Sequence, residues 1–120
     1  MALFGLSDDA LRVLSVIDSQ VRALRKRQLI DGYRAGLRKG VYWGIRTDVT
    51  DYELPDALSC PYAKTLDLAD LATRLGRIDA ATQERLINWG YAVCDAAIRA
   101  HVDSSAPAPA GFPYSAAGVG

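Results

Sequence analysis

The first third of the chain carries a helical pattern of apolar positions. Apolar residues recur every three or four positions, at Ala10, Leu14, Ile17, Val21 and Leu24. This spacing places the five side chains on one face of an α-helix. Ser7 precedes the pattern with a hydroxyl suited to cap a helix. The pattern therefore predicts a helix that begins after Ser7 and either ends near Asp31–Gly32 or continues to Arg38.

The segment Val41–Ile45 has the pattern of a short strand. Valine, tyrosine, tryptophan and isoleucine are good strand formers, and apolar residues on both sides of the alternation are typical of a strand covered on both faces. The rest of the sequence holds no second segment of this kind, although the backbone groups of a strand must be paired. We therefore expect a strand over residues 41–45 that pairs with a sheet built by other residues.

The middle of the chain reads as a long loop followed by a short helix. Residues 47–65 are mostly polar and contain two prolines, and so long a loop inside a compact domain is usually functional or anchored to something else. Thr65 is suited to cap a helix over residues 66–75, which Gly76 would stop.

The last predicted helix starts at the cap Asp79 and runs to Val102. It is apolar nearly all round, which is typical of a helix that lies deep in a larger structure. Residues 103–120 are rich in alanine, proline, glycine and serine, and this composition predicts a flexible tail in which only Phe112-Pro113-Tyr114 is suited to dock. The expected organisation is one mainly α segment, residues 1–102, with one short strand and a tail, residues 103–120.

Charge is balanced overall but uneven along the sequence. The 120 residues have a formal net charge of zero, so the total charge predicts no polyanionic partner and no nucleic acid. Residues 22–46 hold eight bases and one acid, whereas residues 48–70 hold six acids and one base. The most common role of such a run is a solvated helix face. The alternative is a site for an anionic surface, for which the candidate residues are Arg22, Arg25, Lys26 and Arg27.

Other chemistry-bearing residues form no recognisable site. Cys60 and Cys94 lie far apart without metal-site spacing; we expect Cys94 in the core and Cys60 exposed in the loop. The single histidine, His101, suits a helix end. The acidic residues from Asp48 to Asp56 lack EF-hand spacing. We therefore predict no catalytic residue, metal ligand or cofactor.

The sequence also bounds where the protein acts. It holds no apolar run of about 18 residues, so no transmembrane helix is expected, and its first residues lack the pattern of a secretory signal. Two unpaired cysteines fit a reducing compartment. The expected location is the cytoplasm, with peripheral contact to a membrane.

The order of several short elements resembles the C-terminal part of bacterial patatin-like phospholipases. The resemblance spans residues 11–102. The elements that carry it are Arg22–Arg27, Gly40–Ile45, Thr73–Leu75 and Leu86–Tyr91, together with Asp95 and Ala96.

The resemblance implies a three-layer α/β fold, in which residues 41–45 form a late strand of a sheet built mainly by upstream residues. It also implies lipid acyl hydrolysis by a Ser–Asp dyad, with the serine in a G-x-S-x-G turn. This sequence holds no such turn, and Asp31-Gly32-Tyr33 lacks the third small residue of the family's aspartate motif. The expectation is a C-terminal part of such an enzyme, inactive by itself, whose partner is the upstream part of the same polypeptide or a subunit that completes the sheet.

A second interpretation belongs to another functional class. The chain can be read as a small helical interaction module that docks its strand and basic helix on a partner. The two interpretations differ in the size of the polypeptide expected in the cell.

Overall fold

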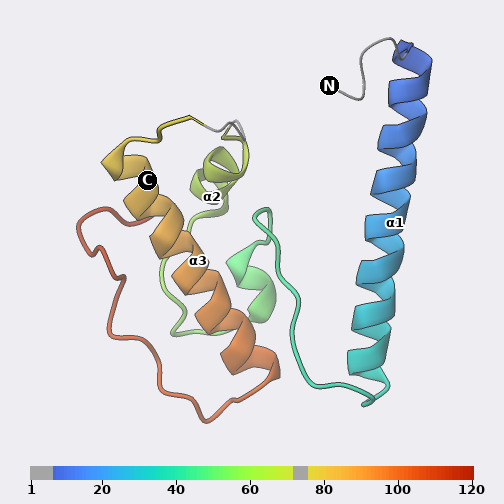
Figure 1. Ribbon diagram of the computed structural model, residues 1–120. Helices are drawn as coiled ribbons and strands as arrows, with labels where there is room; N and C mark the ends of the chain where they lie inside the picture. The colour runs from blue at the N-terminus through green and yellow to red at the C-terminus, as the bar shows by residue number, and fades with distance from the viewer. Residues whose placement is uncertain (1–6, 72–75) are drawn as a thin grey trace. The chain divides into compact units, whose positions relative to one another are not determined.

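The structure, a computed structural model, describes residues 7–71 and 76–120. These residues form three α-helices and one short 3-10 helix: α1 (Asp8–Arg34), η1 (Val49–Tyr52), α2 (Tyr62–Ala69) and α3 (Ala80–His101) (Figure 1). The prediction of a mainly helical chain is confirmed for the described residues. The chain divides into two compact units, residues 1–39 and residues 40–120.

The ends of α1 follow from local sequence signals. The Ser7 hydroxyl accepts a hydrogen bond from the Ala10 amide at 3.2 Å, so the predicted cap is confirmed. At the other end Gly36 adopts a left-handed conformation, with φ of +74°. The amides of Gly36 and Leu37 donate to the carbonyls of Tyr33 and Gly32, which satisfies the last turn in a Schellman arrangement. The helix therefore ends at Arg34, between the two predicted ends.

The predicted strand over residues 41–45 is wrong for this structure. Val41–Gly44 has no regular secondary structure, a turn begins at Ile45, and no described segment forms a ladder with it. Side chains take part of the role of a neighbouring strand: the Tyr52 hydroxyl donates to the Tyr42 carbonyl and the Trp89 indole N–H donates to the Ile45 carbonyl, at 3.1 and 3.2 Å. A strand requires a paired neighbour, and strand propensity alone does not supply one.

The short helix begins earlier than the sequence suggests. α2 starts at Tyr62, directly after Pro61, whose carbonyl accepts hydrogen bonds from Lys64 and Thr65. Thr65 is therefore not a cap. It lies within α2, its side chain is buried, and its hydroxyl donates to the Tyr62 carbonyl. Proline is tolerated where a helix begins, because the N–H that it lacks would have no hydrogen-bond partner within the helix there. The predicted residues 72–75 lie outside the described part of the chain.

The core of the second unit forms around one face of α3. The Asp79 carboxylate accepts from the Thr82 amide at 2.9 Å, so this predicted cap is confirmed. The buried core cluster consists of Val49, Cys60, Leu68, Trp89, Ala92, Val93, Ala96 and Val119. These residues bring η1, α2 and the C-terminal segment against α3 (Figure 1).

The opposite face of α3 is open, which corrects the expectation of a helix buried all round. The side chains of Ile87 and Tyr91 are 48% and 43% exposed. A Cβ added at Gly90 would meet no atom within 4 Å. Within the described residues, therefore, α3 is covered on one side only.

The C-terminal segment is held against α3 rather than free, which differs from the expected flexible tail. The Asn88 side chain is fully buried and bonds only to backbone: its amide donates to the carbonyls of Tyr114 and Gly118, and its oxygen accepts from the Tyr114 amide, at 2.8–3.0 Å. Val119 enters the core and Phe112 packs against it. Composition predicts flexibility, but the hydrogen bonds of one buried amide side chain help to order a segment that forms no regular helix or strand.

Replacing Asn88 tests this arrangement. In Asn88→Ala the Tyr114 amide and two carbonyls lose their partners inside the fold, so we expect the free energy of unfolding to fall by about 2 kcal/mol. Hydrogen–deuterium exchange should accelerate over residues 112–120. Thr82→Ala, at the exposed start of α3, is the control for a substitution in the same helix. Unchanged exchange of the C-terminal segment would contradict the proposed role of Asn88.

Candidate functional site

The four basic candidates all lie on α1 but do not form one patch. At 100° per residue, Arg22 and Lys26 lie on the side opposite the apolar face, whereas Arg25 and Arg27 border that face on its two edges. Arg22 forms an ion pair with Asp18 at 2.6 Å, with both side chains well exposed. An exposed i,i+4 pair contributes only a few tenths of a kcal/mol. The stretch is thus a strongly charged, solvated helix surface.

The side chains on the apolar face of α1 are exposed, as are the charged ones on its other side. None of the 27 residues of α1, all of which the structure describes, is buried. The exposed large apolar side chains include Leu14, Ile17, Val21 and Leu24. Scattered apolar side chains are normal on a protein surface, but a continuous row on one helix face marks an interaction site.

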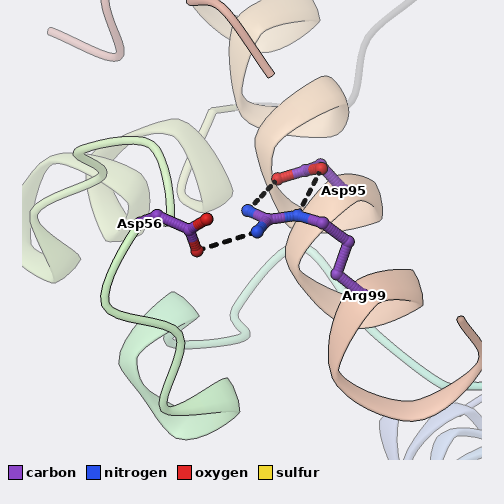
Figure 2. Close-up of polar contacts among 3 residues, drawn as sticks. All are labelled: Asp56, Asp95 and Arg99. Carbon is purple, nitrogen blue, oxygen red and sulfur yellow. Dashed lines mark hydrogen bonds and ion pairs between the residues drawn. The ribbon is translucent and has the colours of Figure 1, made fainter. Parts of the chain in front are cut away.

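An ion cluster around the buried side chain of Arg99 joins the loop before α2 to α3 (Figure 2). Arg99 is 7% exposed, and its guanidinium donates two hydrogen bonds of 2.9 Å to Asp95 and one of 2.8 Å to Asp56. Asp95 lies one helical turn earlier, so α3 itself fixes the bidentate pair. Asp56 completes the cluster from a loop 43 residues away in sequence.

The electrostatics of this cluster favour a structural role. The hydrogen bond from Arg99 holds the pKa of the Asp56 carboxyl below its ordinary value. The hydrogen bonds to Asp95 and Asp56 raise the pKa of the Arg99 guanidinium. The Asp56 carboxyl and the Arg99 guanidinium therefore stay charged at neutral pH, and neither is poised to exchange a proton. The cluster ties a loop to a helix and does not resemble a site for acid–base catalysis.

Sequence reasoning missed both Arg99 and Asn88. The signal for the first was the spacing of four between Asp95 and Arg99, which suits an ion pair on one helix face. The signal for the second was an amide side chain at a position bordered by Ile87 and Trp89. Neither signal predicts the partner that is distant in sequence, which is Asp56 for Arg99 and the C-terminal segment for Asn88.

The two cysteines are placed opposite to expectation. Cys60, expected in an exposed loop, is 5% exposed in the core, and burial raises the pKa of its thiol to about 11. Cys94, expected in the core, is only half-buried because it lies towards the open side of α3. A thiol with a raised pKa is a poor nucleophile at neutral pH, so Cys60 acts as a small core residue.

His101 and Asp48 have partners within the second unit. The imidazole ring of His101 makes an edge-on contact with the Tyr52 ring, with 5.6 Å between centroids. The Asp48 carboxylate caps η1 by accepting from the Thr50 amide and hydroxyl. Among the described residues, no group of three or more histidines, cysteines or carboxylates is arranged to hold a metal ion.

An open apolar groove lies beside residues 43–45 of the second unit. It is lined by Trp43, Gly44 and Ile45 and by four residues of α3: Leu86, Trp89, Gly90 and Val93. Trp43 and Ile45 are 37% and 51% exposed. The segment expected to be a strand therefore presents its apolar side chains to an uncovered hollow. This groove is the candidate contact surface of the second unit.

Comparison with models of protein families, with curated proteins and with solved structures finds no match to this chain. No helix among the described residues is both long enough and apolar enough to cross a bilayer.

The buried cluster can be tested by breaking it. In Arg99→Met the nearly buried Asp95 loses its partner, so we expect the free energy of unfolding to fall by about 3 kcal/mol. Urea unfolding followed by tryptophan fluorescence measures this change. The matched control is Arg46→Met, which breaks the exposed pair between Arg46 and Asp70 and should cost less than about 1 kcal/mol.

The same cluster predicts a pH dependence. The pKa of Asp56 is lower in the folded state than in the unfolded state, so the ionised carboxylate stabilises the fold. This contribution is fully present above the unfolded-state pKa of about 3.9 and is lost as the pH falls through the folded-state pKa. Asp56→Asn should remove this acid-dependent part. Equal losses for Arg99→Met and Arg46→Met, or an unchanged pH profile in Asp56→Asn, would contradict the role given to the cluster.

Proposed function

We propose that this chain is the C-terminal part of a patatin-like lipid acyl hydrolase, a cytoplasmic phospholipase or esterase whose catalytic dyad lies in upstream residues. The observation that carries the proposal is the segment Val41–Ile45, which is rich in strand formers, forms no ladder with any described segment, and lines an open apolar groove together with α3. A sheet placed there would pair the backbone of the segment and cover Trp43 and Ile45.

The open side of α3 supports the same interpretation. Ile87 and Tyr91 are exposed large apolar side chains, and Gly90 leaves open space between the turns that carry them. A glycine on such a face allows another backbone to approach closely. In a three-layer α/β fold the helix would lie on the sheet with this side, while its other side keeps the core already formed.

In such an enzyme the chain would contribute structure rather than chemistry. It would complete the sheet at one edge and cover it with α3, while the Ser–Asp dyad and the oxyanion-hole amides come from upstream residues. No residue of this chain is assigned to the acyl-transfer step, and none is proposed to bind a cofactor or a metal.

The test is whether the cellular polypeptide that contains Leu86–Arg99 carries a reactive serine. We expect a species larger than 13.0 kDa that reacts with a fluorophosphonate probe, while the purified 120-residue chain stays unlabelled because it holds no G-x-S-x-G turn. Peptide mass spectrometry of the labelled species should place the probe upstream. Heat-treated extract is the control for labelling that requires a folded site. A stable, unlabelled species of 13.0 kDa would contradict the proposal.

A second candidate function is that of a small helical interaction module. The observation that favours it is that residues 40–120 close a core of their own, with the C-terminal segment bound to α3 through Asn88. The same mass measurement separates the two functions, because a module is a stable species at the size of this chain.

The basic residues of α1 add a proposed contact with anionic lipid. Arg22 and Lys26 share one side of the helix, and basic residues near an anionic bilayer contribute about 1 kcal/mol each. We expect Arg22→Glu/Lys26→Glu to release the chain from phosphatidylserine vesicles at low salt. Arg46→Glu, a charge reversal in the second unit, is the control. Vesicle binding that survives the reversal at Arg22 and Lys26 would contradict this contact.

A further inference from the structure

The apolar face of α1 has the repeat of a two-stranded coiled coil. Its side chains fall at alternating spacings of four and three, at Ala10, Leu14, Ile17, Val21 and Leu24. From Leu14 to Leu24 this seam is between 41% and 54% exposed. Because helix propensity alone seldom stabilises a helix in water, a helix that buries no side chain needs a partner along its seam.

The charges of α1 are separated along its length. Its first half carries the acids Asp8, Asp9 and Asp18, with Arg12 as the single base. Its second half carries one acid, Asp31, and five bases: Arg22, Arg25, Lys26, Arg27 and Arg34. Two copies paired in parallel would place basic half against basic half. Two antiparallel copies place the acidic half of each against the basic half of the other and also oppose the helix dipoles favourably.

One antiparallel register aligns the apolar seams of both copies. With Ile17 opposite Val21 of the second copy, Leu14 lies opposite Leu24 and Ala10 opposite Gln28. The two-fold axis then passes near residue 19, where the two copies of Asp18 approach each other. Each of these carboxylates is already paired with Arg22 of its own helix at 2.6 Å, so their mutual repulsion is reduced. Arg22 and Lys26 stay on the outside of the pair.

We propose that two copies of this chain associate through an antiparallel coiled coil of their α1 helices, along the seam Leu14, Ile17, Val21 and Leu24. A second copy fits this face better than a bilayer does. The seam carries no aromatic residue that would anchor it at a membrane interface. The inference does not depend on the proposed enzymatic function, since the seam and the groove beside Trp43 lie on different units.

Sedimentation velocity of the full chain over a range of concentrations tests the association. We expect a dimer, and in Ile17→Asp a monomer, with the dissociation constant raised by at least about 100-fold because a carboxylate replaces an apolar side chain at the centre of the seam. The matched control is Ser19→Asp, which adds the same charge on the opposite face and should leave the dimer intact. Unfolding followed by the fluorescence of Trp43 and Trp89, which both lie in the second unit, reports whether this unit keeps its fold in each variant.

Salt distinguishes the orientation of the two helices. Antiparallel pairing brings opposite charges together, so added salt should weaken the dimer, whereas a parallel dimer would tighten as repulsion between the basic halves is screened. Three results would overturn the proposal: a monomer at every concentration, a dimer that Ile17→Asp leaves intact, or a dimer that added salt tightens. A monomer that loses binding to phosphatidylserine vesicles in Ile17→Asp would assign the seam to a lipid surface instead.

Discussion

The burial of one face of α3 is the constraint on which the second unit depends. Trp89, Val93 and Ala96 from this face meet η1, α2 and the C-terminal segment, none of which is large enough to fold by itself. Burying a large apolar side chain is worth roughly 1.5–3 kcal/mol, so a core of this size is small against the conformational entropy of ordering the loops around it. Polar anchors are therefore needed to hold those loops in place.

Two buried polar side chains of α3 supply these anchors in different ways. Asn88 is neutral and satisfies backbone groups of the C-terminal segment directly. Arg99 is charged and holds the loop at Asp56, while Asp95 from its own helix balances its charge. A buried charge without such partners would cost several kcal/mol. The helix thus positions two segments that have little regular structure of their own.

The open surfaces of the two units have different characters. In the second unit the groove beside Trp43 is apolar and adjoins a segment of strand formers that forms no ladder with any described segment; this combination suits a sheet. In α1 the exposed apolar side chains from Leu14 to Leu24 follow a repeat of alternating threes and fours along a helix; this combination suits another helix. The physical form of each surface therefore indicates a different kind of partner, which is why an enzyme scaffold and a self-associating helix can be proposed for the same chain.

The sequence by itself determined the features that depend on near neighbours. Ser7 and Asp79 mark the starts of α1 and α3 because a cap bonds to an amide three residues away, and the seam of α1 follows from helical periodicity alone. Only the tertiary structure decided that Cys60 is buried, that Asn88 orders the C-terminal segment, that Asp56 meets Arg99 and that residues 41–45 form no strand ladder with any described segment. Each of these features depends on contacts between residues far apart in the sequence, or on a strand neighbour that the described residues do not provide. A local sequence pattern specifies neither of these.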